Sequence, residues 1–270
     1  MNTRDGSSVI PILLAGGRGT RIAHLRPGIP KPVIPVLGRP FICHLFEQLA
    51  GAGFREAVVS IGYNAEVFRA ELHKAGPHPL ALHFVDEPEP LGTGGAVAYS
   101  IAQARLHPSH WLVLNGDSFL AGDWPTALQR AAPEPHSAPG QGPGQACLLA
   151  RWVEDRSASG ALEMEGDRLT GFREKCLSGP GWINAGIYLF PDAWLREVPA
   201  GKSASLERDL LPAWLAGGRP IRVLPREDAF LDIGTPTSLA MADAFLETWK
   251  PRTPADVPPT APGENLCAPA

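Results

Sequence analysis

The first half of the sequence alternates short apolar segments, rich in β-branched residues, with segments of helical periodicity. The predicted strands are Val9–Ala15, Ala57–Ile61, Leu80–Val85 and Trp111–Leu114, and the predicted helices are Phe41–Gly53, Asn64–Ala75 and Thr93–Leu106. Such alternation is typical of an α/β fold in which helices cover both faces of a sheet. We therefore expect a Rossmann-like, mostly parallel sheet, with ligands bound beyond the carboxyl ends of its strands.

Strand-like segments dominate the second half. They are Cys147–Val153, Ala161–Glu165, Arg168–Arg173 and Ile187–Phe190, with a turn at Glu165-Gly166-Asp167 between the second and the third. Helices are predicted at Ser205–Ala216 and Thr237–Trp249, and the second has Thr235 as its N-cap and Pro236 at its first position. We expect this half to form a further lobe on the same sheet.

Two segments rich in proline lie outside this pattern. Residues 131–145 predict a flexible surface insertion, and residues 251–270, with six prolines and few apolar side chains, predict a disordered tail. A chain of 270 residues is long enough for one large core. We therefore predict one domain at residues 9–250, with halves at about 9–130 and 146–250.

Charge narrows the classes of partner. The net charge of −4 argues against nucleic acid and against an anionic membrane. Residues 6–46 contain no acidic residue but include five cations, Arg18, Arg21, Arg26, Lys31 and Arg39. A cationic segment in an acidic chain favours a small polyanion such as phosphate, although chance clustering on a solvated face is the alternative.

The sequence also predicts a location and a redox state. No segment has 18 consecutive apolar residues, and residues 1–11 lack the apolar core of a signal peptide, so we expect a cytoplasmic protein. The four cysteines are scattered without the spacing of a zinc site or a disulfide framework. We therefore expect reduced thiols.

A glycine-rich loop, Leu14-Ala-Gly-Gly-Arg-Gly-Thr-Arg21, follows the first predicted strand. The backbone N–H groups of its three glycines can approach a phosphate without interference from a Cβ atom, and its two arginines add charged donors. The spacing matches neither the Walker A loop nor the GxGxxG fingerprint. A tight connection without a ligand is the alternative.

Two further residues suit phosphate chemistry. Lys31 stands between Pro30 and Pro32, which restrict its backbone on both sides, and this favours a phosphate ligand over a solubilising charge. Asp117 closes the strand-like segment HWLVLNGD and presents a carboxylate at the edge where a ligand is expected. The alternative for Asp117 is a turn or helix-capping residue.

These motifs occur with others in an order that resembles a known family. LAGGRGTR and KPVIPVLGRP are followed by EPLGTGG, LNGD, EK, NAG and FLDIG, over residues 9–248. The set resembles the sugar-1-phosphate nucleotidyltransferases, and within them the bacterial D-glycero-D-manno-heptose 1-phosphate guanylyltransferases. The resemblance implies a GT-A-like nucleotidyltransferase domain with a nucleotide-binding first half and a sugar-binding second half. No hexapeptide pattern of a C-terminal left-handed β-helix is visible.

The resemblance also implies roles for the motif residues. Arg18 would bind the pyrophosphate leaving group, and Lys31 and Lys175 would bind the reacting phosphates. Asp117 and Asp232 would together bind a Mg²⁺ ion. The residues implied to contact the nucleotide are Leu14, Ala15, Gly16, Gly17, Gly19, Thr20, Arg21, Glu87, Gly92 and Thr93. Those implied to contact the sugar are Asn115, Gly116, Glu174, Asn184 and Gly186. From the residues alone, the alternative for Asp232 is a turn or helix-capping residue, and the alternative for Glu174-Lys175 is an exposed charged pair. Cys176 stands where the family often has proline.

Glu87 is the residue implied to recognise the base. A carboxylate accepts two hydrogen bonds from guanine N1–H and N2–H₂, whereas uracil and thymine offer one such donor, which favours GTP. Glu89 is an alternative reader, and either glutamate can be a solvated turn residue. The turn Gly92-Thr-Gly-Gly95 is expected to lie flat against the base or ribose and to offer free N–H groups at a helix start.

The sequence therefore predicts an enzyme that joins an NTP to a sugar 1-phosphate, releasing pyrophosphate and an NDP-sugar for glycan biosynthesis. One alternative is a uridylyl- or thymidylyltransferase that acts on a hexose 1-phosphate. Others are a non-catalytic sugar-nucleotide-binding regulator and, from the glycine loop alone, a dinucleotide-binding oxidoreductase. We expect no nucleic acid or membrane partner, and the sequence leaves the oligomeric state open, a homodimer included.

Overall fold

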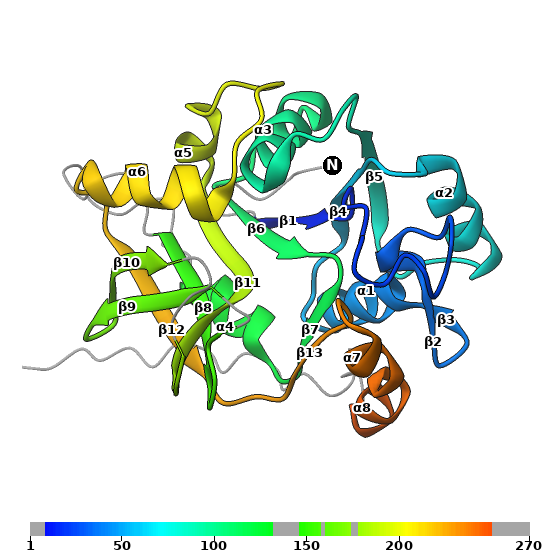
Figure 1. Cartoon of the computed structure of the whole chain (residues 1–270). Helices are drawn as coiled ribbons and strands as arrows, with labels where there is room; N and C mark the ends of the chain where they lie inside the picture. The colour runs from blue at the N-terminus through cyan, green and yellow to red at the C-terminus, as the bar shows by residue number, and fades with distance from the viewer. Residues whose placement is uncertain (1–8, 132–145, 158–159, 174–177, 250–270) are drawn as a thin grey trace, which may run out of the picture.

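The computed structural model describes residues 9–131, 146–157, 160–173 and 178–249. Its centre is a nine-stranded sheet in the order β5-β4-β1-β6-β11-β8-β12-β10-β9 (Figure 1). The strands are β1 (Val9–Leu14), β4 (Glu56–Ile61), β5 (Ala81–Asp86), β6 (His110–Asn115), β8 (Ala146–Val153), β9 (Ala161–Glu165), β10 (Arg168–Arg173), β11 (Gly181–Pro191) and β12 (Ile221–Arg226).

The first four strands in this order, β5, β4, β1 and β6, are parallel to one another. Beyond them the sheet is mixed: β11 is antiparallel to β6 and β8, β8 is parallel to β12, and β10 is antiparallel to β12 and β9. The predicted Rossmann-like α/β class is therefore confirmed, with the parallel part concentrated in the first half. The second half extends the same sheet, as expected.

Helices cover both faces of the sheet (Figure 1). Helices α1 (Phe41–Gly51), α2 (Ala65–Lys74), α4 (Trp124–Ala131) and α8 (Ala242–Thr248) pack on one face, and α3 (Gly92–Ala104), α5 (Asp192–Arg196) and α6 (Leu211–Ala216) pack on the other. In β1, Leu13 belongs to the first core and its neighbour Ile12 to the second. Burial on both sides explains why this strand is apolar without alternation.

Several helices begin or end at other residues than the sequence predicts. Residues Leu206–Leu210 form a π-helical turn, η2, before α6, and the last predicted helix is interrupted at Met241 between α7 (Pro236–Ala240) and α8. The predicted N-cap at Thr235 is confirmed as a capping box with Ser238. Ala131, which the sequence assigned to the insertion, ends α4. The remaining insertion, residues 132–145, and the tail, residues 251–270, lie outside the described residues.

Two short sheets were not predicted. Strands β2 (Pro35–Val36) and β3 (Arg39–Pro40) form a small hairpin. Strand β7 (Ser118–Leu120) pairs antiparallel with β13 (Phe230–Asp232), so that Asp232 lies opposite Ser118. The Ile233 N–H also donates to the Asp117 carbonyl oxygen at 3.1 Å. This pairing brings two motifs that are far apart in the sequence to one place.

Within the described part of the chain, no helix has the length and apolarity that crossing a membrane requires.

Candidate functional site

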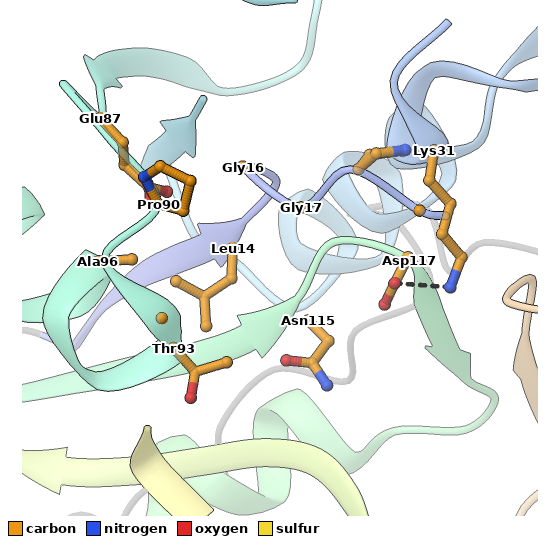
Figure 2. A pocket seen from close by; sticks show the side chains of 13 residues that line it. Leu14, Gly16, Gly17, Lys31, Glu87, Pro90, Thr93, Ala96, Asn115 and Asp117 are labelled. Carbon is orange, nitrogen blue, oxygen red and sulfur yellow. Dashed lines mark hydrogen bonds and ion pairs between the residues drawn. The ribbon is translucent and has the colours of Figure 1, made fainter. Parts of the chain in front are cut away.

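A cavity of about 350 Å³ lies beyond the carboxyl ends of β1, β5 and β6 (Figure 2). Glu87 and Pro90 lie at one end of it, and Lys31 and Asp117 lie at the other (Figure 2). The cavity is lined by Leu14, Gly16, Gly17, Gly19, Lys31, Pro32, Glu87, Pro90, Gly92, Thr93, Ala96, Asn115 and Asp117. The place is the one expected for ligands in an α/β sheet.

Lys31 connects the two aspartates that the sequence singled out. Its Nζ donates to Asp117 Oδ2 at 2.6 Å and to Asp232 Oδ1 at 2.9 Å. Only 7% of the Lys31 side chain is exposed, against 33% for Asp117 and 44% for Asp232. The alternative of a solubilising surface lysine is therefore excluded. A lysine ammonium has three N–H groups, so one remains for a ligand.

Local geometry explains how these three residues meet. Lys31 begins a short 3-10 turn, η1 (Lys31–Val33), directly after Pro30, whose φ of −59° is fixed by its ring. Asp117 stands in the turn between β6 and β7, and Asp232 ends β13, the partner strand of β7. The Gly234 N–H donates to Asp232 Oδ1 at 2.7 Å and fixes the orientation of that carboxylate.

Arg21 lies beside the same cluster. A Cβ atom on Gly234 would lie 2.8 Å from Lys31 Nζ and 2.9 Å from the Arg21 guanidinium. Two cations and two carboxylates thus share one small region, and Gly234 leaves them the space. Arg21 is exposed, and it is not among the described residues that line the cavity.

The two aspartates fit a hard cation. Both carboxylates are partly exposed and retain oxygen lone pairs that Lys31 does not use. Mg²⁺ is commonly held by one or two carboxylates, with phosphate and water oxygens completing its octahedron. The described residues contain no group of three or more histidine, cysteine, aspartate or glutamate side chains that could hold a metal ion.

The glycines of the first loop serve three different purposes. A Cβ atom on Gly16 would lie 2.3 Å from Glu87 Oε1, so Gly16 allows the Glu87 carboxylate to approach the loop. Gly19 has φ +57° and lies against the Lys31 side chain. Gly17 alone of the three has no described atom within 4 Å of an added Cβ atom. Gly16 and Gly19 are therefore also required by neighbouring side chains, while both still line the cavity.

The other residues of this loop are distributed around the cavity. Leu14 lines the cavity, whereas Ala15 is buried in the core. Arg18 borders a neighbouring cavity of about 250 Å³, together with Gly16, Gly17, Gly62, Tyr63, Glu87 and Pro88 to Pro90. Thr20 is exposed and, in the described structure, lines neither cavity.

Glu87 faces both cavities. Its Oε1 accepts a hydrogen bond from Ser60 Oγ at 2.8 Å. Burial raises the pKa of the Glu87 carboxyl above its ordinary value, while hydrogen bonds from Ser60 and the Leu91 backbone oppose that shift. A carboxyl group in this setting is not a solvated turn residue. Glu89 is exposed and borders only the second of the two cavities in the described structure.

The Gly92–Gly95 turn differs from the expectation. The N–H groups of Gly94 and Gly95 both donate to the Ala204 carbonyl oxygen, at 2.8 and 3.1 Å. A Cβ atom on Gly92 would lie 2.6 Å from that same oxygen, and one on Gly95 would lie 2.3 Å from the Lys202 oxygen. The glycines are therefore required by the chain at 202–204, and the expectation of free N–H groups at Gly94 and Gly95 is wrong. Gly92 and Thr93 still line the cavity.

The residues assigned to the sugar lie where β11 passes the end of β6. Asn115 lines the cavity, and Gly186, with φ +72°, lies against the Asn115 side chain. Gly116 donates to the Leu14 oxygen at 2.9 Å and has a packing role. Asn184 Oδ1 accepts from the Gly186 N–H at 3.0 Å. Glu174 and Lys175 lie outside the described residues.

Sequence reasoning missed several residues around the cavity. Pro32, Pro90 and Ala96 line it, and Ser60 bonds to Glu87. Tyr63 borders the second cavity and follows β4, so the rule that ligands bind at carboxyl ends of strands could have found it. Apolar lining residues carry no comparable sequence signal.

Residues 10–248 match the model of the nucleotidyl transferase family. The mannose-1-phosphate guanylyltransferase of Mycobacterium tuberculosis is 32% identical over 239 residues, which are 87% of this chain and 64% of that protein. The chain thus spans less than two thirds of that relative. The D-glycero-alpha-D-manno-heptose 1-phosphate guanylyltransferase of Campylobacter jejuni is 30% identical over 226 residues, 83% of this chain and 94% of that protein.

A solved structure shares the fold. The crystal structure of HddC from Yersinia pseudotuberculosis complexed with GMP-PN superposes with a TM-score of 0.73 and 27% sequence identity. The match covers 87% of this chain and 98% of that chain. The similarity in fold therefore extends over nearly the whole of that protein.

Proposed function

Because this chain belongs to the nucleotidyl transferase family, we propose that it joins GTP to a sugar 1-phosphate and releases pyrophosphate. The observation that carries the proposal is the Lys31 ammonium, shared by Asp117 and Asp232 at one end of a cavity whose other end carries Glu87. A nucleoside triphosphate has a base at one end and a polyphosphate at the other. The cavity offers a matching group at each end.

The chemistry requires no protein nucleophile and no general base. The phosphate oxygen of a sugar 1-phosphate is already an anion near neutral pH, so it can attack the α-phosphorus of the nucleotide in line. Catalysis then consists of positioning the reactants and neutralising their charge. The remaining Lys31 N–H would hold a reacting phosphate, and Arg18 would bind the leaving pyrophosphate. Lys175 keeps its proposed role toward the sugar phosphate.

Asp117 and Asp232 would hold Mg²⁺, as their exposed lone pairs allow. When bound there, the ion would neutralise charge on phosphate oxygens and fix their geometry. Lys31 then has a second function, because its ammonium keeps two neighbouring carboxylates close together in the absence of substrate. Two carboxylates without a cation between them would repel each other.

Glu87 supports the choice of GTP. Its carboxylate lies behind Gly16, is held by Ser60, and reaches both cavities that border the loop. A fixed carboxylate suits the two adjacent N–H donors of guanine. Tyr63, at the border of the second cavity, offers an aromatic ring beside the proposed base position. The HddC complex with GMP-PN agrees with a guanine nucleotide.

For the sugar, we propose D-glycero-D-manno-heptose 1-phosphate. The heptose-specific relative from Campylobacter jejuni is matched over 94% of its length. Mannose 1-phosphate, named for the relative from Mycobacterium tuberculosis, is the competing substrate. The side chains of Asn115 and Asn184, with the backbone at Gly186, would provide hydrogen bonds to sugar hydroxyls.

The test is a matrix of GTP, ATP, CTP, UTP and dTTP against heptose, mannose and glucose 1-phosphates, with pyrophosphate release as the readout. We expect the highest kcat/KM for GTP with the heptose 1-phosphate. A preference for mannose 1-phosphate would change the sugar only. A preference for UTP or dTTP would overturn the role of Glu87. No pyrophosphate from any pair would overturn the transferase proposal and favour a non-catalytic sugar-nucleotide-binding protein.

A further inference from the structure

A hydrogen-bond network around Glu207 lies next to the proposed active site. Glu207 belongs to the π-helical turn η2 and, in the described structure, does not line the main cavity. Its Oε1 accepts from the Tyr188 hydroxyl at 2.8 Å. Its Oε2 accepts from Thr93 Oγ1 and Ser205 Oγ, each at 2.9 Å. Three hydroxyl groups from three separate segments therefore donate to one carboxylate.

One branch of the network leads to the proposed sugar side. The Tyr188 oxygen accepts from Asn184 Nδ2 at 2.5 Å, and Asn184 Oδ1 accepts from the Gly186 N–H at 3.0 Å. The register of β11 against β8 shifts between Asn184 and Tyr188, so the backbone here departs from a regular strand. Because Tyr188 donates to Glu207, its oxygen is available to orient the Asn184 amide.

The other branch leads to the proposed nucleotide side. Thr93 Oγ1 accepts from the Leu206 N–H at 2.8 Å while donating to Glu207. Its hydroxyl hydrogen is therefore committed to Glu207 and is not offered to a ligand, although Thr93 lines the cavity. The same segment of chain supplies the Ala204 oxygen that binds the Gly94 and Gly95 N–H groups.

Three hydroxyl groups point their hydrogens at Glu207. An ionised carboxylate only accepts, so it sets the rotation of the Tyr188, Thr93 and Ser205 hydroxyls at once. Burial raises the pKa of the Tyr188 hydroxyl well above its ordinary value, and the nearby Glu207 charge acts in the same direction. The tyrosine therefore keeps the proton that it donates.

We propose that Glu207 is a positioning residue for the transfer proposed above, holding Thr93 on the nucleotide side and Asn184 on the sugar side in a fixed relative arrangement. Glu207 touches neither substrate. It acts through Thr93 directly and through Tyr188 on Asn184. The proposal rests on the proposed function, because it assigns the two sides of the site to the two substrates.

The first test is Glu207→Gln, with Glu197→Gln as the matched control. Glutamine keeps the shape of the side chain but places an NH₂ group where an acceptor is needed. We expect KM to rise about tenfold for both GTP and the sugar 1-phosphate, because small displacements of positioning groups are costly. Glu197 is exposed, pairs with Arg219, and should leave both KM values unchanged.

The second test separates the two branches. Tyr188→Phe removes the link to Asn184 and should raise KM for the sugar 1-phosphate with that for GTP unchanged. Thr93→Val should raise KM for GTP with that for the sugar unchanged. Adding Tyr188→Phe to Glu207→Gln should have little further effect on the sugar KM, because the two residues act in series. Tyr188→Phe and Thr93→Val also test the positioning role if Glu207→Gln fails to fold.

The outcomes distinguish the two proposals. If the wild type is active and Glu207→Gln has the same kinetics as Glu197→Gln, the positioning role is overturned and the proposed function is not. A lower Tm for Glu207→Gln with unchanged KM values would also overturn it, because that result describes a structural residue. Additive effects of Tyr188→Phe and Glu207→Gln would show that Glu207 does not act through Tyr188. An inactive wild type would overturn the proposed function and, with it, this inference.

Discussion

Lys31 and Asp117 are 86 residues apart in the sequence, yet Lys31 Nζ lies 2.6 Å from Asp117 Oδ2. The Lys31 side chain is almost fully buried, and Asp117 is partly exposed and lines the cavity. Asp117 can therefore coordinate a further cation with a free lone pair while it remains hydrogen-bonded to Lys31. This arrangement would place a fixed positive charge and the carboxylate proposed to hold a metal within reach of the same phosphate.

Replacement of Asp117 by asparagine should lower kcat about 10²-fold or more, the usual effect of removing electrostatic stabilisation from a transition state. Asp232→Asn should act similarly, and wild-type activity should require Mg²⁺ or Mn²⁺. Pyrophosphate release measured with and without EDTA checks both expectations. Full activity of Asp117→Asn in EDTA would show that these carboxylates hold no essential metal.

Replacement of Glu87 by glutamine should reduce the preference for GTP over UTP by about 1–3 kcal/mol, the penalty for a mismatched buried hydrogen-bonding group. Glutamine accepts one hydrogen bond and donates another, so it suits guanine less well. The ratio of kcat/KM for GTP and UTP is the measurement, and Glu89→Gln is the control. If Glu89→Gln changes the ratio and Glu87→Gln does not, Glu89 reads the base.

Glu87 should also make stability depend on pH. Burial raises its pKa in the folded state, so its contribution to stability is present below the unfolded pKa and is lost as the pH rises through the folded pKa. Glutamine at position 87 does not titrate. The Tm of Glu87→Gln relative to wild type should therefore increase as the pH is raised through this range.

Gly95→Ala should destabilise the protein, because the new Cβ atom would lie 2.3 Å from the Lys202 oxygen. Overpacking of this kind costs about 1–3 kcal/mol, which exceeds the gain of up to about 1 kcal/mol from alanine in a helix. Gly17→Ala is the control, since an added Cβ atom there meets no described atom within 4 Å. Thermal unfolding should show a lower Tm for Gly95→Ala only. Equal Tm values for the two variants would mean that the backbone at residues 202–204 moves to accommodate the added Cβ atom.

A chain ending at Lys250 should fold and retain its turnover, because residues 251–270 have too little apolar surface to offset the entropy of ordering them. A chain ending at Thr248 is the comparison. It lacks Trp249, whose ring packs edge-on against Phe119 with centroids 4.9 Å apart. We expect a lower Tm for the shorter chain. A large loss of Tm or kcat in the longer one would show that the tail contributes contacts.

The elements of the first half could be predicted because periodicity and turn residues agreed. Strands β1, β4 and β6 are mostly buried and apolar, and the partly exposed edge strand β5 still has a run of apolar residues around His83. Strand β12 was missed although the buried Ile221 and Val223 alternate with partly exposed residues, as expected for a strand. Strands β7 and β13 have three residues each, and only their mutual pairing defines them. Such pairing is a tertiary property that no local pattern predicts.

At the site, the sequence predicts which residues take part better than it predicts the contacts between them. The sequence pointed to Lys31, Asp117 and Asp232, but not to the hydrogen bonds that join them. The sequence assigns the Gly92–Gly95 turn to the ligand, and Gly92 does line the cavity, but the glycines also accommodate the carbonyl groups at Lys202 and Ala204. No sequence pattern singles out Glu207, because an acidic residue in the first turn of a helix is ordinary. Its function depends on Tyr188 and Thr93, which are distant in sequence.

The pairing of β7 with β13 sets the order in which the site can be assembled during synthesis. Lys31 and Asp232 are separated by 201 residues, so the lysine and one aspartate leave the ribosome long before their last partner does. Contacts of such long range are slow to form because the chain between them must first be ordered. The sheet from β5 to β6 can fold earlier from contiguous sequence. A nascent chain therefore contains Lys31 and Asp117 long before Asp232, and this cluster is complete only after β13 has been synthesised.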